Sequence, residues 1–335
     1  NSTTYKMSEL TTSSHDGLVS SHAYSGCYGG QNANNGDIIV TEVECPSYPS
    51  TLTDKQIIFV VDESGSMSDT IMSLRASLFA ARNSLLRLVA HDISNIDETG
   101  RDQLFSTNCN ASLITFSDVA RHRWESDQAK SFQQHYISSA DLTPTRLHLV
   151  PESKSVSFSE AVNDINADHS TNMGDALKMA FDMKLPDCAT WIILLTDGMS
   201  NKGPCQTLHS FKNLVKDLPP CTKIIPLGYS TDFDPDILSA LGNMTYVDTE
   251  ERIAEIFGGI VGEIVSCYGM DATIILPHLE VDVITPYDVI VVPDDIGDQP
   301  RDIIGTQHIG CLFNERKFIY GWLPWGNTRK SVFSR

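Results

Sequence analysis

The feature that most constrains the fold is an alternation of short apolar runs with helix-like segments through the middle of the chain. The run at 57–61 is short, rich in β-branched residues and closed by polar turn residues, which is typical of a strand buried on both faces of a parallel sheet. Residues 69–91 place apolar side chains every three or four positions, which predicts a long amphipathic helix with Ser68 or Asp69 as its N-cap. The same patterns predict further strands at 111–116, 122–124, 190–195, 223–227 and 245–247, and further helices at 158–165, 173–183, 208–218, 235–241 and 250–265. This order predicts an α/β fold with a doubly wound, mostly parallel sheet flanked by helices.

The two ends of the chain have a different pattern. Residues 269–335 alternate with period two between turn-like clusters, which predicts a β-rich module. Residues 1–17 are rich in Ser and Thr and are expected to be mobile, before two candidate strands. Two strands cannot bury a face alone, so we expect the N-terminal pair to join the C-terminal strands in a β-sandwich-like module. The expected strands lie at 18–24 and 37–44, and at 272–276, 279–284, 288–292 and 317–323. The expected partition is an N-terminal arm with strands at 1–52, the α/β domain at 53–268 and the β-rich module at 269–335.

Charge and composition exclude several classes of function. The chain has 335 residues, with 24 Lys and Arg against 43 Asp and Glu, for a formal net charge of −19. Nucleic-acid binding and anionic membrane surfaces both require clustered cations, so neither is expected as a partner. No apolar run approaches the ~20 residues that cross a bilayer. The eight cysteines contain no Cys-x-x-Cys pair, which argues against a zinc knuckle or a redox motif. The compartment is left open: a cytoplasmic location is slightly favoured over an extracellular or assembly-associated one.

Oxygen-bearing side chains follow the predicted parallel strands at the points where open α/β sheets place their sites. Asp62, Ser64 and Ser66 come directly after the first strand, Thr171 precedes the helix at 173–183, and Asp197 follows the strand at 190–195. Hydroxyl and carboxylate oxygens are hard ligands, which Mg²⁺ prefers. A divalent metal site is therefore predicted at this edge of the sheet. The alternative is that Asp62 and Ser64 only cap the long helix and Asp197 starts an ordinary turn, which requires coincidence at all five positions.

These residues resemble a von Willebrand factor type A domain with a complete metal-ion-dependent adhesion site. The family pattern D-x-S-x-S matches Asp62, Ser64 and Ser66, and the later Thr and Asp of the pattern match Thr171 and Asp197. The resemblance covers 53–265, about two thirds of the chain. It implies that the two serines and the threonine contact the metal, while the two aspartates act directly or through water. It also implies Mg²⁺ as the cofactor, with Mn²⁺ or Ca²⁺ possible.

Residues beside these ligands are expected to form the rim that meets a partner. His169 and Ser170 stand where many family members carry glycines, and Glu63, between the ligands, is not expected to bind the metal. The expected rim comprises Met67, His169, Asn172, Met199, Asn201 and Lys202, although helix packing is an equal alternative for Met67.

The chain is expected not to be an enzyme. It has no H-E-x-x-H pair, no G-x-S-x-G elbow and no phosphate-binding glycine loop. The resulting hypothesis is a metal-dependent protein-binding module, in adhesion or as a scaffold, whose Mg²⁺ accepts an Asp or Glu carboxylate from a partner protein. The alternatives are a structural component of a larger assembly and a metal-dependent hydrolase. The sequence leaves the partner's identity and the oligomeric state open.

Overall fold

The computed structural model divides the chain into two compact units, Asn1–Pro49 with Ser266–Arg335, and Ser50–Val265. It describes residues 55–90, 92–132, 156–186, 188–197, 200–229, 233–247, 252–267 and 270 in full. It describes strand backbones also within 7–15, 19–28, 36–44, 267–276, 281–284, 305–313 and 317–324. The partition into 1–52, 53–268 and 269–335 stays a prediction.

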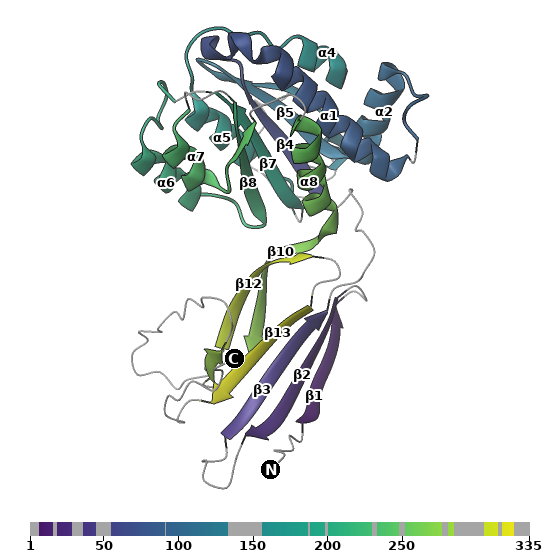
Figure 1. Ribbon diagram of the computed structural model, residues 1–335, viewed down its shortest axis with the longest axis vertical. Helices are drawn as coiled ribbons and strands as arrows, with labels where there is room; N and C mark the ends of the chain where they lie inside the picture. Colours follow the sequence, from purple (N-terminus) through teal and green to yellow (C-terminus); the bar gives the residue numbers. More distant parts are fainter. Residues whose placement is uncertain are drawn as a thin grey trace, which may run out of the picture. The chain divides into compact units, whose positions relative to one another are not determined.

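A six-stranded sheet forms the centre of the second unit (Figure 1). Its order is β6-β5-β4-β7-β8-β9, and all neighbours are parallel except β5 and β6. The strands are β4 (Lys55–Asp62), β5 (Asn110–Phe116), β6 (Ala120–Glu125), β7 (Ala189–Thr196), β8 (Thr222–Tyr229) and β9 (Thr245–Val247). Helices flank this sheet, so the predicted α/β fold class is confirmed.

Helices cover both faces of the sheet (Figure 1). One face carries α5 (Met173–Asp182), α6 (Leu208–Lys216) and α7 (Pro235–Leu241). The other carries α1 (Ile71–Val89), α2 (Glu98–Asn108), α4 (Phe158–Asn163) and α8 (Ile253–Ser266). The strands that follow β4 in sequence are added first on one side of it (β5, β6) and then on the other (β7, β8, β9), so loops from both halves of the sheet meet at the carboxyl end of β4.

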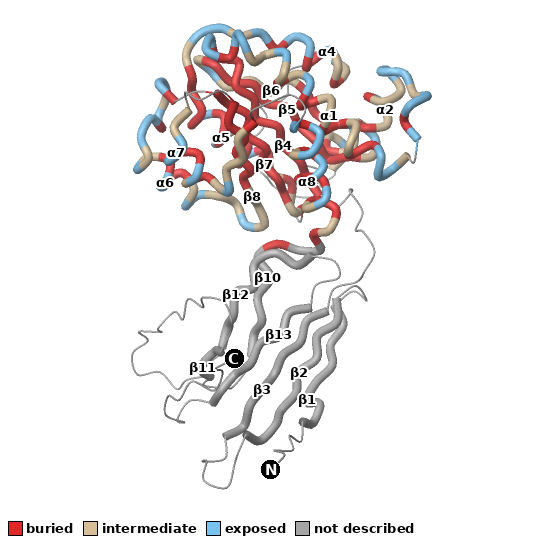
Figure 2. The backbone as a smooth tube through the Cα atoms, in the orientation of Figure 1, coloured by how far each residue is buried: buried red, intermediate tan, exposed pale blue. Residues whose placement is uncertain are grey.

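The core follows the alternation of side chains along the strands. Every residue of β4 is buried, and Figure 2 shows the strands as the buried centre of this unit. Ile58 and Val60 pack in the core beneath α5, α6 and α7, whereas Phe59 meets the ring of Phe158 from α4. A continuous apolar run thus serves a strand covered on both faces.

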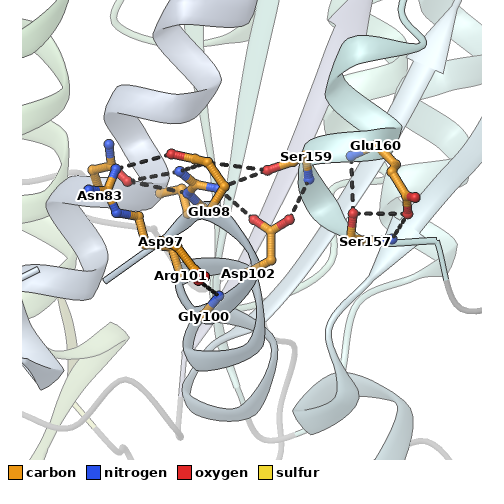
Figure 3. A network of polar contacts seen from close by, with 10 residues as sticks. Asn83, Asp97, Glu98, Gly100, Arg101, Asp102, Ser157, Ser159 and Glu160 are labelled. Atoms are coloured by element: carbon orange, nitrogen blue, oxygen red, sulfur yellow. Dashed lines mark hydrogen bonds and ion pairs between the residues drawn. The ribbon is translucent and has the colours of Figure 1, made fainter. Parts of the chain in front are cut away.

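A buried arginine joins three helices of one face. Arg82 is 0% exposed, and its guanidinium donates to Asp102 at 2.5 Å, Glu98 at 2.7 Å and Ser159 at 3.1 Å. Figure 3 shows these partners with Asn83, converging from α1, α2 and α4. The second oxygen of Asp102 accepts the Ser159 N–H at 2.8 Å. The buried charges are therefore paired and hydrogen-bonded, as burial requires.

Two expectations about the helices differ from the structure. The long helix begins at Ile71 after a 3₁₀ turn, Gly65–Asp69, and its N-cap is Thr70, so the expected caps Ser68 and Asp69 are wrong. The 3₁₀ turn displaces the helix start by closing hydrogen bonds from Met67 N to Ser64 O and from Thr70 N to Met67 O. The sequence analysis missed α2, because most of its residues are polar and it is anchored by ion pairs rather than an apolar stripe.

The first unit contains a sheet in the order β1-β2-β3-β13-β11 and a second with β10 and β12. The N-terminal β3 pairs with the C-terminal β13, from Lys317 opposite Glu44 to Trp322 opposite Ile39. The expected association of the two chain ends is thus present as strand pairing, whereas their packing as a sandwich stays a prediction. These strands are β1 (Met7–His15), β2 (Val19–Tyr28), β3 (Gly36–Glu44), β10 (Cys267–Leu276), β11 (Val281–Ile284), β12 (Gly305–Phe313) and β13 (Lys317–Pro324).

Two strands of this unit were not expected. Residues 7–15 form β1, which pairs with β2, so the mobile segment predicted at 1–17 is wrong over that range. A run rich in Ser and Thr pairs here through its backbone, which the apolar pattern does not detect. The strand β12 was also missed, and the strand predicted at 288–292 lies outside the described residues. Among the helices that the structure describes, none combines the length and apolar character that crossing a membrane needs.

Candidate metal centre

Two aspartates meet at the carboxyl ends of neighbouring strands. Asp62 is the last residue of β4, and Asp197 directly follows Thr196, the last residue of β7. The two strands are parallel, with Val61 opposite Leu195, so both ends reach the same edge of the sheet. The hydroxyl of Thr196 donates to Asp62 Oδ2 at 2.5 Å and holds this carboxylate in place. Both aspartates are almost fully buried, with exposures of 0% and 3%.

The two serines lie between these carboxylates. Asp62 Oδ1 accepts the backbone N–H of Ser64 at 2.9 Å, which turns the chain back over the strand end. The hydroxyls of Ser64 and Ser66 are 3.1 Å apart, and Ser66 Oγ donates to Asp197 Oδ1 at 2.9 Å. Four of the five predicted ligands are thus joined in one network of oxygen atoms.

The fifth predicted ligand, Thr171, lies in the loop before α5. Its N–H donates to Asn201 Oδ1 at 2.9 Å, and its carbonyl accepts the N–H groups of Asn201 and Lys202 at 3.0 and 3.1 Å. The same loop reaches the serine loop, because Gly65 N–H donates to the His169 carbonyl at 3.0 Å. Backbone hydrogen bonds therefore bring the segments after β4 and β7 and the loop before α5 together.

The expected rim residues divide into exposed and buried ones. His169, Asn201 and Lys202 are exposed. Met67 is 0% exposed and packs inside the 3₁₀ turn, so the rim role expected for it is wrong and the packing alternative holds. Asn172 is also buried, at 4%, because its side chain caps α5 and donates to the Asp118 carbonyl at 3.1 Å, so it does not belong to an exposed rim either. Met199 lies outside the described residues.

Burial of Asp62 and Asp197 makes their negative charges unfavourable unless the charges are neutralised. Burial raises the pKa of Asp62 to about 6, against hydrogen bonds from Thr196 and Ser64 that lower it, and the charge of Asp197 raises it further. Two buried carboxylates with the hydroxyls of Ser64 and Ser66 form a hard, oxygen-only donor set that a dication would neutralise. The donor chemistry of these residues therefore fits Mg²⁺.

Comparisons with known proteins bear on the fold. No protein-family model matches the sequence, and no curated protein matches it. A von Willebrand factor type A protein from Catenulispora acidiphila is similar in structure, with a TM-score of 0.51, 15% identity, and coverage of 98% of this chain and 66% of that one. The α/β unit has the fold of a von Willebrand factor type A domain.

Two further solved structures match at lower scores. Proximal thread matrix protein 1 from the mussel byssus, solved with a zinc-occupied MIDAS motif, has a TM-score of 0.40 and 13% identity, covering 70% of this chain and 50% of that one. The pilus adhesin SpaC from Lactobacillus rhamnosus GG, in its open conformation, has a TM-score of 0.42 and 13% identity, covering 90% and 42%. The chain therefore spans about two thirds of the Catenulispora acidiphila protein and half or less of the other two.

One loop of this type A fold has an unusual backbone. His169 has a φ of 67°, in the left-handed region that favours glycine. Many members of the type A family carry glycine at this point of the loop. The N–H of His169 donates to Asp168 Oδ1 at 2.8 Å, its carbonyl accepts from Gly65, and its ring nitrogen lies 3.1 Å from Asp168 Oδ2. Contacts on both sides of the residue thus hold a conformation that glycine would adopt without strain.

Two residues that the sequence pattern did not single out hold the loops around the candidate site. Asp118, in the turn after β5, accepts the Ser170 N–H at 3.1 Å and pairs with Lys202 at 2.9 Å. These contacts lower the pKa of Asp118 to about 2. The available signal was its position, because Asp118 also follows the carboxyl end of a strand beside β4. Gly203, with a φ of 79°, lets Asn172 approach so closely that an added Cβ would lie 1.9 Å from its Oδ1.

Proposed function

We propose that the α/β unit binds a partner protein through a divalent cation, held by Asp62, Ser64, Ser66, Thr171 and Asp197. The observation that carries this proposal is the joined network of four of these side chains at the carboxyl ends of β4 and β7. Mg²⁺ bound there, or Mn²⁺ or Ca²⁺, would supply an electrophilic position that a carboxylate oxygen of the partner can occupy.

The residue types explain why such a site would attract an acidic partner. Ser64, Ser66 and Thr171 offer oxygens without charge, so only the two aspartates offset the charge of the dication. In a chain with a net charge of −19, a local positive centre is what makes an Asp or Glu side chain a favourable ligand. Exposed Asn201 and Lys202 beside the Thr171 loop would complete the contact.

The type A fold is compatible with two other roles. The chain could be a structural component of a larger assembly in which the metal mainly stabilises the fold, or a metal-dependent hydrolase. We favour a non-enzymatic role, with 1–52 and 269–335 as a β-sandwich-like support, for which the pairing of β3 with β13 is the supporting observation.

The first experiment measures the metal directly. Calorimetric titration with MgCl₂, MnCl₂ and CaCl₂ should show binding to the wild type and to Asp92→Ala, an exposed carboxylate in another loop. Asp62→Ala should lose the binding heat yet still unfold cooperatively in a chelator, because the residue ends a strand and its carboxylate bonds to the Ser64 N–H and the Thr196 hydroxyl at that same end. Unchanged Mg²⁺ affinity in Asp62→Ala would reject the site.

The second experiment tests the carboxylate. N-acetyl-aspartyl amide should bind the Mg²⁺-loaded protein and not the chelated protein, and N-acetyl-asparaginyl amide should bind neither. Thr171→Ala should weaken this binding while lowering the free energy of unfolding by only about 1 kcal/mol, because the substitution removes a single hydroxyl from a residue that the backbone bonds of its loop still hold. Equal binding of both amides, with and without Mg²⁺, would favour the structural role; turnover of a phosphoester or peptide dependent on Asp62 would favour the hydrolase.

A further inference from the structure

A buried carboxylate that the proposed metal site does not use lies within residues 62–66, which carry three of the proposed ligands and are called the metal loop below. Glu63 lies between Asp62 and Ser64, and its side chain is only 3% exposed. It contacts Arg121 at 2.6 Å and Arg123 at 3.0 Å, both on the edge strand β6. A buried carboxylate next to two predicted ligands is expensive unless its charge is neutralised.

The same residue joins the loop to its surroundings through its backbone. The Glu63 N–H donates to the Phe116 carbonyl at 2.8 Å, and the Glu63 carbonyl accepts the N–H of Asp168 at 2.8 Å. Phe116 ends β5, and Asp168 lies in the loop that carries Thr171. Any displacement of Glu63 would therefore reach both neighbouring loops.

The two arginines extend these connections. Arg121 lies 3.4 Å from Ser117 Oγ, and the Ser117 carbonyl accepts the N–H of Asn172. Arg123 donates to Thr115 Oγ1 at 2.9 Å and pairs with Asp164, after α4, at 3.3 Å. Two arginines and the carboxylates of Glu63 and Asp164 form a cluster with no net charge.

We propose that Glu63, Arg121 and Arg123 act on the metal loop through their charge balance, which sets its affinity for Mg²⁺. The arginines neutralise Glu63, so its charge does not add to those of Asp62 and Asp197 at the proposed site. The three side chains hold the loop from outside the oxygen network, as residues behind metal ligands commonly do. This inference rests on the proposed metal site.

Charge substitutions separate this role from ordinary structural support. Glu63→Gln keeps the shape of the side chain but leaves the cluster with one net positive charge beside the metal loop, so Mg²⁺ affinity should fall about 10–100-fold. Arg123→Gln leaves the charge of Glu63 partly uncompensated, so Mg²⁺ affinity should rise several-fold. The double variant Glu63→Gln/Arg123→Gln restores the balance and should bind within a few-fold of the wild type.

Calorimetric titration with MgCl₂ tests these signs, with Arg101→Gln as the matched control. Arg101 pairs with Glu98 on α2, away from the metal loop, and its replacement changes the net charge by the same amount as Arg123→Gln. Opposite shifts for the two single variants, with an unchanged control, are the expected result. A weakening in both single variants, added together in the double variant, would overturn the inference and show that the cluster only supports the fold. An unchanged Glu63→Gln would overturn it as well. A wild type that binds no Mg²⁺ would instead overturn the proposed function.

Discussion

Replacing Glu125 by glutamine should change how the stability of the protein depends on pH. Glu125 is the last residue of β6 and is 5% exposed. Burial raises the pKa of its carboxyl to about 7, although the positive charge of Lys130 lowers it. The ordinary pKa of a glutamate is about 4.5. The neutral form is therefore the one that the folded protein accommodates best.

The sign and size of the effect follow from this difference. Because the folded pKa lies above the unfolded one, the contribution of Glu125 to stability is fully present below pH 4.5. It is lost as the pH rises through 7. A shift from 4.5 to about 7 corresponds to about 3 kcal/mol of unfolding free energy. The glutamine side chain of the variant would stay neutral at every pH and would not show this loss.

Urea unfolding of the wild type and Glu125→Gln between pH 4.5 and 8, with chelator throughout, measures the effect. The variant should match the wild type or fall slightly below it at the acid end, and it should be up to about 3 kcal/mol more stable at pH 8. The control is Asp127→Asn, because Asp127 is an exposed carboxylate close in sequence. Parallel pH profiles for the wild type and Glu125→Gln would refute the reasoning.

Two further substitutions test the packing of the type A fold. Arg82→Met should lower the unfolding free energy by about 3–5 kcal/mol in urea, because it leaves the buried Asp102 without its cation; adding Asp102→Asn should recover part of the loss. Gly203→Ala should cost about 2 kcal/mol and weaken Mg²⁺ binding in calorimetry, because a Cβ would strike Asn172 and the backbone has a positive φ. Wild-type stability of either single variant would contradict the contacts that surround Arg82 and Gly203.

The strands of the α/β unit were predictable because burial on both faces leaves a continuous apolar signal. Residues 57–61 mark β4 (Lys55–Asp62) within two residues at each end. The carboxyl ends of such strands define where polar side chains gather, so Asp62 and Asp197 are predicted to lie at the same edge of the sheet. Strand direction predicts which loops share this edge, whereas the full set of five candidate ligands is implied by the resemblance to the type A family.

Elements that polar groups hold in place left no such signal. The helix α2 is held by Glu98 and Asp102, which bind the buried Arg82. They lie 16 and 20 positions after Arg82 in the sequence, so no helical periodicity connects them to it. The strand β1 is a run rich in Ser and Thr that pairs through its backbone. Hydrophobic periodicity detects elements that bury apolar side chains. It does not detect a helix held by ion pairs or a strand held by backbone pairing.

The candidate ligands of the metal loop were more predictable than the residues that hold the loop in place. A ligand needs a particular oxygen at a particular strand end, and a sequence motif records that requirement. A residue that holds the loop needs only to form a hydrogen bond or to balance a charge. Many residue types can do so, and here they come from positions far apart in the sequence. His169 illustrates the difference: Gly65 binds its carbonyl and Asp168 its N–H, so the left-handed backbone is held by its neighbours and does not require glycine. A departure from the family pattern at this position is therefore compatible with an intact loop, because contacts supply what glycine would supply through conformational freedom.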